Sequence, residues 1–166
     1  MIRSIEDFVS LWKQEAASTL SLFRELSDAA MSQAVTMEHR DLGRLAWHIT
    51  GTIREMMERT GLHVAGPEEG AAVPSSSAEI VRQYKESSDS LVQALQAWTD
   101  EDLETEDSMY GETWKRSLTL QILLLHQTHH RGQMTVLMRQ AGLAVPGMYG
   151  PAKQDWAKFG MPTPTL

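Results

Sequence analysis

The sequence of 166 residues contains no cysteine. This absence excludes disulfide bonds, thiolate zinc sites and a cysteine nucleophile. Any sulfur chemistry would therefore need a substrate that brings the sulfur atom. Any bound metal would need nitrogen and oxygen ligands from the protein.

The sequence also lacks long apolar runs and an excess of basic over acidic residues. No run approaches the roughly 20 apolar residues of a membrane-spanning helix, and the N-terminal segment lacks the apolar centre of a signal peptide. The formal net charge is -7, whereas general binding to nucleic-acid phosphates needs a basic surface. We therefore expect a cytoplasmic protein that binds neither a membrane nor nucleic acid.

Signals for β-strands are missing too, because apolar and polar residues do not alternate for long and no Asn-Gly or Asp-Gly turn occurs. Apolar residues instead recur every three or four positions, which is typical of helices with one buried face. Four such patterns cover about residues 4–30, 41–60, 77–98 and 114–141. They predict an all-α fold of four long helices in a single domain, residues 1–166.

The connections between these helices are longer than the turns of a simple up-and-down bundle. Residues 62–76 are polar and rich in glycine and proline, and 15 extended residues could span ~50 Å. Residues 99–113 form a second long link. Links of this length predict a four-helix bundle with crossover connections.

The C-terminal tail, residues 144–166, is interrupted by glycine and proline. Residues 151–159 could form a short helix, because Pro151 suits the first helical position and Gly160 suits the position after the last turn. Trp156 and Phe159 would then lie on one side of this helix. We expect that side to dock on the bundle as a packing lid.

Two histidines of the last helix stand where a helical protein can build a metal site. His126 and His130 are four residues apart, which places both rings on one face, about one turn apart. Both lie in the apolar stripe of the helix, where a polar ring costs free energy unless a partner satisfies it. A divalent metal is such a partner, because it binds neutral imidazole.

A third ligand must come from another segment, and His48 is the candidate. It lies in the middle of the second helix, beside the apolar residue Ile49. Facing mid-helix positions are where helical bundles hold metals. Three imidazoles with one open position suit zinc or nickel. If the three rings do not meet, the histidines are ordinary hydrogen-bonded core residues.

The remaining histidines leave alternatives. His129 follows His126 by three residues, so it could replace His130 as the partner, although it points about 60° to the other side of the helix. His39 and His63 flank the second helix, where we expect exposed loop positions. A di-iron centre is excluded, because no histidine has an acidic residue three positions before it.

Three features spread along the chain resemble those of one family. They are a histidine in the second helix, a late His-x-x-x-His-Arg-Gly-Gln run at 126–133, and a tail in which Tyr149-Gly150-Pro151 precedes Trp156. Together they resemble the DinB/YfiT-like metalloenzymes over nearly the whole chain. The His-Arg-Gly-Gln run is the most specific of the three.

The resemblance implies a four-helix bundle of the up-down-down-up type, usually a homodimer, with a divalent metal on three side chains. Carried onto this sequence, the ligands are His48, His126 and His130, with water completing the shell. The family includes S-transferases that use low-molecular-weight thiols and isomerases that depend on mycothiol. The resemblance therefore implies a small-molecule substrate, with such a thiol among the candidates.

A metal held by three neutral imidazoles keeps its double charge and can lower the pKa of a water or thiol in an open position. We therefore expect a metal-dependent transferase or hydrolase, in which Arg131 and Gln133 contact a ligand histidine or the substrate. The simpler alternatives are a solvated surface for Arg131 and helix packing for Gln133. For function, the alternatives are a non-catalytic, stress-associated metal-binding protein and a helical interaction module without metal.

Overall fold

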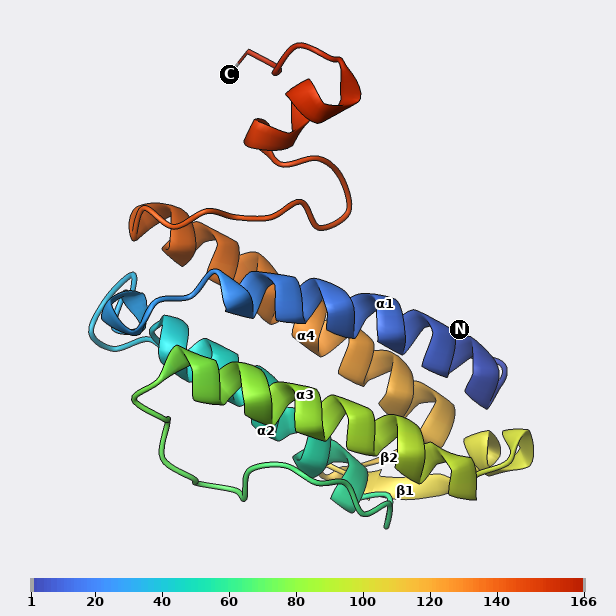
Figure 1. Ribbon diagram of the computed structural model, residues 1–166. Coiled ribbons are helices and arrows are strands. Elements are labelled where there is room, and N and C mark those ends of the chain that lie inside the picture. Colours follow the sequence, from blue (N-terminus) through green and yellow to red (C-terminus); the bar gives the residue numbers. More distant parts are fainter. Residues whose placement is uncertain (1, 166) are drawn as a thin grey trace.

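The computed structural model describes residues 2–165, and helices account for most of them. Its four long helices are α1 (Ile5–Arg24), α2 (Leu42–Glu58), α3 (Ser77–Ala94) and α4 (Arg116–Gln140). Shorter 3-10 helices are η1 (Asp28–Ala30), η2 (Leu95–Ala97), η3 (Asp100–Glu104) and η4 (Lys153–Phe159). Each predicted helical pattern corresponds to one α-helix, so the mostly helical fold is confirmed (Figure 1).

Capping side chains determine where the first two long helices begin. The Ser4 hydroxyl accepts the backbone N–H of Asp7 at 3.0 Å, and the Asp41 carboxylate accepts that of Arg44 at 2.8 Å. Both contacts satisfy amides that have no partner within the first helical turn. At the other end α1 stops at Arg24, earlier than the predicted residue 30, and only η1 continues the predicted pattern.

The four long helices pack around one apolar core. Helix α2 packs against α3 and α4, and α1 packs against the same two helices. The core between them is filled by large side chains that are fully buried, among them Phe8, Trp12, Ile53, Met56 and Tyr84. The Trp12 indole also donates to the Ser88 hydroxyl at 3.0 Å, which ties α1 to α3.

Residues 59–76 connect α2 to α3 and run back along the outside of the helices (Figure 1). Trp47 of α2 donates its indole N–H to the Ala71 carbonyl at 2.9 Å. Arg54, about two turns further along α2 on the same face, donates to the Gly66 carbonyl at 3.0 Å. These bonds hold the link against α2, where it forms a wall beside the helix.

The link between α3 and α4 contains a β-hairpin, so the prediction that strands are absent is wrong. Strands β1 (Glu106–Met109) and β2 (Glu112–Lys115) pair in antiparallel fashion. The turn residues Tyr110 and Gly111 have φ values of 52° and 86°, the positive values that a two-residue hairpin turn requires. Tyrosine takes the first turn position, where the sequence signal would have been asparagine or aspartate.

The tail contains the predicted short helix, η4, but this helix stands away from α1–α4 (Figure 1). Phe159 is 61% exposed. The expected docking of η4 on the helices is therefore not what the single chain shows. The tail touches the helices earlier, through Tyr149, whose hydroxyl donates to the Glu15 carboxylate of α1 at 2.7 Å.

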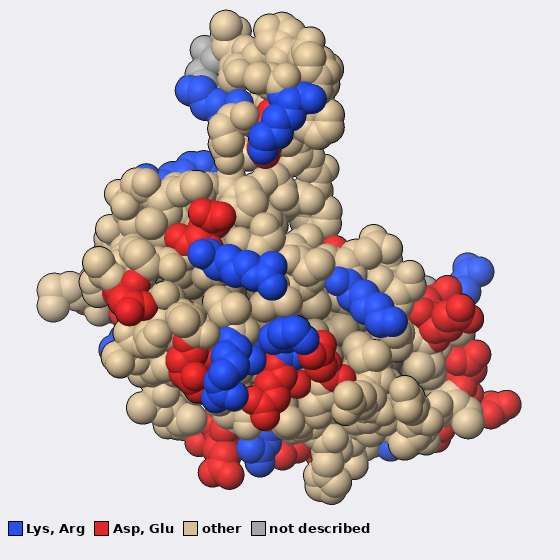
Figure 2. Space-filling model, viewed as in Figure 1, with Lys and Arg blue, Asp and Glu red and all other residues tan. Residues whose placement is uncertain are grey.

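Acidic and basic side chains are interspersed on the face shown in Figure 2, and neither sign gathers into an extended patch there. Ion pairs within one helix account for several charged residues of α3, such as Arg82 with Glu79 and Lys85 with Asp89. Within residues 2–165, no helix has the length and apolarity that crossing a bilayer requires.

Candidate metal centre

Three histidines from two facing helices meet in the interior. They are His48 on α2 and His126 and His130 on α4, and their potential ligand atoms all lie within 4.8 Å of one another. The Nε2 atom of His126 is 3.1 Å from Nε2 of His48 and 3.2 Å from Nε2 of His130. The structure therefore brings together the three residues that the sequence predicted as a group.

The packing of α2 on α4 explains why these positions meet. Where α2 ends and α4 begins, the Arg116 guanidinium donates to the Thr60 carbonyl at 3.1 Å. A rise of about 1.5 Å per residue then places His48 ~18 Å before Thr60, and His126 and His130 ~15 Å and ~21 Å after Arg116. The three rings thus stand at the same height along the two helices.

The spacing of the nitrogen atoms fits a common metal ion. Two imidazole ligands at ~2.0–2.1 Å from zinc, with bond angles between a right angle and the tetrahedral value, lie ~2.9–3.4 Å apart. The two measured Nε2–Nε2 distances, 3.1 and 3.2 Å, fall within this range. The donor set, three imidazoles without a thiolate, also suits a divalent ion such as zinc or nickel.

Ordinary hydrogen bonding explains the arrangement less well. A neutral imidazole nitrogen carries either a proton or a lone pair. Nε2 of His126 therefore cannot donate to one neighbour while it accepts from the other. A cation at the shared point would satisfy all three lone pairs at once, so the geometry favours a metal over a hydrogen-bonded cluster.

The rings are neutral at neutral pH. Burial, and after it nearby positive charge, lowers the pKa of both His48 and His126 to about 4. Burial also lowers the pKa of His130, against an opposing contribution from its bond to Gln133. Neutral imidazole is the form that binds metal, so these rings need not lose a proton before they bind a cation.

Gln133 supplies an outer partner for the centre. Its Oε1 atom lies 2.7 Å from Nδ1 of His130. A proton on that Nδ1 leaves the lone pair of Nε2 directed at the other rings. The Nε2 atom of Gln133 lies 3.1 Å from Nε2 of His129, which is exposed and outside the group of three. The alternative in which His129 replaces His130 therefore has no support from the geometry.

Arg131, next to His130 in the sequence, lies outside the histidine group and is buried against α1. It is 2% exposed, so the solvated surface that sequence alone allowed is wrong. Its guanidinium forms an ion pair with Glu15 of α1 and donates to the Glu15 carbonyl at 2.6 Å and to the Tyr149 hydroxyl at 2.6 Å. These contacts join α4 to α1 and to the tail. A part for Arg131 in a reaction stays a prediction.

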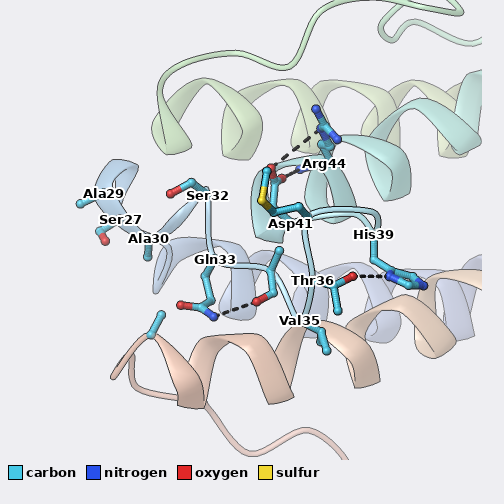
Figure 3. Close-up of a pocket in the computed structure, with 13 residues that line it drawn as sticks. Ser27, Ala29, Ala30, Ser32, Gln33, Val35, Thr36, His39, Asp41 and Arg44 are labelled. Atoms are coloured by element: carbon cyan, nitrogen blue, oxygen red, sulfur yellow. Dashed lines mark hydrogen bonds and ion pairs between the residues drawn. The ribbon is translucent and has the colours of Figure 1, made fainter.

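The two flanking histidines are exposed, as predicted. His39 forms a hydrogen bond with the Thr36 hydroxyl at 2.6 Å, within a loop that borders a cavity of about 710 Å³ (Figure 3). None of the three grouped histidines lines this cavity. His63 lies in the link after α2.

A second cavity, of about 730 Å³, opens beside the centre. It lies between α2 and the link of residues 59–76, and His48 is part of its wall. Arg40 and Glu55 line it as well. Sequence analysis did not identify Arg40, because its place beside the cavity depends on the tertiary structure around the start of α2.

Three neutral histidines on facing helices, beside a cavity, define a candidate metal centre in a mostly helical protein. The sequence motifs around this centre resembled one family, and a direct comparison agrees. The model of the DinB family matches residues 1–165, so the chain belongs to the DinB family.

Relatives support this assignment. The chain is 42% identical over 167 residues to a Bacillus subtilis (strain 168) protein named "Uncharacterized protein YrdA", and the match covers 100% of both. A crystal structure of a DinB-like protein from Bacillus cereus ATCC 10987 shares 43% identity with a TM-score of 0.86, covering 90% of this chain and 100% of that one. A second crystal structure, of the DinB-like protein YjoA from B. subtilis, has a TM-score of 0.67 and covers 88% of this chain and 99% of that one. Its sequence identity is 19%, so this likeness shows a common fold and nothing more.

Proposed function

We propose that this protein binds a divalent metal ion, zinc or nickel, on His48, His126 and His130. The observation that carries the proposal is the convergence of the Nε2 atoms, with His126 at 3.1 and 3.2 Å from its two neighbours. Such an ion, when bound, would supply positive charge that lowers the pKa of a water or thiol beside it. Gln133 would orient His130, and burial would keep all three rings neutral.

We further propose that the protein is a metal-dependent transferase or hydrolase for a small-molecule substrate, with a low-molecular-weight thiol or water as the nucleophile. The cavity of about 730 Å³ beside His48 supports this, because a ligand site of that size suits a small molecule. The chain has no cysteine, so a sulfur nucleophile would come from a second molecule. A non-catalytic metal-binding protein would have no need for such a cavity.

We also propose the finer architecture that the family resemblance implies, an up-down-down-up four-helix bundle that forms a homodimer. The contacts of α1 and α2 with both α3 and α4 support the bundle. Exposed apolar side chains in the tail, such as Phe159 and Met161, support a partner surface. The net charge of -7 supports a partner other than nucleic acid.

Metal stoichiometry of single histidine variants tests the proposal. Protein prepared without a polyhistidine tag should bind one zinc or nickel ion per chain, measured by elemental analysis after dialysis. His126→Ala should lose this binding, because it removes the central nitrogen of the three. His129→Ala, a change at a neighbouring position outside the group, should retain it. Circular dichroism should show both variants folded.

Two results would contradict the proposal. One is a wild-type protein that takes up no stoichiometric metal even after zinc or nickel is added. The other is a folded His126→Ala variant that binds the metal with unchanged affinity, which would show that the ligands lie elsewhere.

A further inference from the structure

The cavity beside His48 is lined by charged side chains of both signs. Its floor is α2 and its far wall is the link of residues 59–76. Its volume of about 730 Å³ suits a small molecule rather than a polymer. Its charged residues are four arginines and four glutamates: Arg40, Arg44, Arg54, Arg59, Glu55, Glu58, Glu68 and Glu69.

Three of these arginines are engaged with carboxylates. Arg54 and Arg59 each contact a glutamate one helical turn away at 2.6 Å, and Arg44 reaches Asp41 at 3.8 Å. Arg40 differs, because within residues 2–165 no carboxylate oxygen lies within 4.0 Å of its guanidinium. Its side chain is exposed to the cavity and forms no hydrogen bond inside the described part of the chain. Arg40 is therefore the cation of this cavity that remains available to a ligand.

Arg40 also lies close to the metal centre. It directly precedes Asp41, the residue that caps α2, and shares the cavity wall with His48. After burial, the positive charge of Arg40 is one of the causes that lower the pKa of His48, His126 and His130. Because Arg40 and His48 border one cavity, a single small molecule could contact both.

None of the acids that line this cavity is paired with Arg40. Glu58 and Glu68 both contact Arg54, at 2.6 and 3.9 Å, and Glu69, which lies on the link, forms no ion pair within residues 2–165. The three imidazoles are neutral, and the nearby acid Glu55 is already bound to Arg59 at 2.6 Å and to the Tyr110 hydroxyl at 2.6 Å. A divalent ion on the histidines would add two positive charges beside Arg40. Like charges this close repel, and a bound anion that touches both would remove the repulsion.

We infer that Arg40 binds the oxyanion group of a small molecule whose other end lies at the three histidines. The inference rests on the proposed function and specifies its substrate class, a thiol or hydroxyl compound that carries a carboxylate, sulfonate or phosphate. A guanidinium suits this task, because its planar fork binds two oxygen atoms of one oxyanion. Arg40 is then a binding residue that selects anionic over neutral substrates.

Thiol binding to cobalt-loaded, full-length protein tests the inference without an enzyme assay. A thiolate that joins the Co²⁺ shell changes its absorption spectrum, so affinity can be titrated. The probes are mercaptoacetate with a carboxylate, mercaptoethanesulfonate with a tetrahedral oxyanion, and neutral mercaptoethanol. Wild-type protein should bind at least one of the two anions about tenfold more tightly than the neutral thiol. This preference should shrink at high salt, because the contact is solvent-accessible.

Variants assign the preference to one residue. Arg40→Gln should abolish it while Co²⁺ and mercaptoethanol still bind, and Arg40→Lys should keep part of it. Arg82→Gln, an exposed change on α3, should leave it unchanged. A stronger preference for mercaptoacetate would identify a carboxylate as the group that Arg40 binds, and one for mercaptoethanesulfonate would identify a tetrahedral oxyanion.

The contrary results separate this inference from the proposed function. Wild-type protein that binds Co²⁺ but shows no preference for anionic thiols would overturn the inference alone, as would an Arg40→Gln variant that keeps the full preference. Wild-type protein that binds no Co²⁺ would overturn the proposed function and this inference with it.

Discussion

His126 is the residue on which the candidate centre depends most, because both other rings approach its Nε2 atom. Its Nδ1 atom is buried and has no hydrogen-bond partner in the described part of the chain. Packing alone therefore orients this ring. His130 is held differently, since its Nδ1 lies 2.7 Å from the amide oxygen of Gln133. An outer bond of this kind fixes the tautomer and the orientation of a metal-binding histidine.

Replacement of Gln133 tests how much this outer bond contributes. Gln133→Leu should weaken zinc binding roughly tenfold, because His130 loses the acceptor that keeps its Nε2 lone pair free. Competition with a chromogenic chelator measures the change. The same substitution at Gln140, exposed near the end of α4, should leave zinc affinity unaltered. Equal affinities for both variants and the wild type would show that His130 needs no support from Gln133.

At the scale of elements, the long helices were predictable and the short hairpin was not. A long helix repeats its apolar stripe over several turns, so the pattern survives local exceptions. Strands β1 and β2 have four residues each, too few for an alternation to be recognised. The turn between them depends on Tyr110, which adopts a φ of 52°, although its residue type gives no signal for that conformation.

The same contrast applies to the site. The spacing of His126 and His130 within one helix is a local property, and the sequence revealed it. The meeting with His48 depends on how α2 packs against α4, so spacing alone left it open, and the family resemblance supplied it. Arg40 and the burial of Arg131 are consequences of tertiary structure, which no local pattern records.

Replacing glycine with alanine should change the free energy of unfolding in opposite directions at Gly111 in the hairpin and at Gly132 in α4. Gly111 has a φ of 86° in the hairpin turn, so Gly111→Ala should destabilise the fold by about 1 kcal/mol. Gly132 lies within α4, and an added Cβ there would meet no atom within 4 Å. Gly132→Ala should therefore stabilise by about 0.5–1 kcal/mol. Urea unfolding measures both, and changes of the same sign would contradict the assigned backbone conformations.

For the whole molecule, the buried histidines make the metal-free fold sensitive to acid. His48 and His126 have an ordinary pKa of 6.5, and burial lowers it to about 4 in the folded chain. Between these two values the unfolded chain binds more protons than the folded one. The free energy of unfolding is therefore not reduced by these histidines above pH 6.5, and it decreases as the pH falls from 6.5 towards 4. The carboxylate of Glu79, with a pKa of about 2 in the fold against 4.5 ordinarily, affects stability only below about pH 4.5.

We therefore expect the melting temperature of chelator-treated protein to fall steadily between pH 6.5 and 4.5, as measured by circular dichroism. Zinc should raise the melting temperature at pH 7, because it binds only the folded chain. This increase should vanish towards pH 5, where protons compete for the same nitrogen atoms. His63→Gln, a change at an exposed histidine, should follow the wild-type profile. A melting temperature that stays constant over this pH range would show that the three rings are not held neutral by burial.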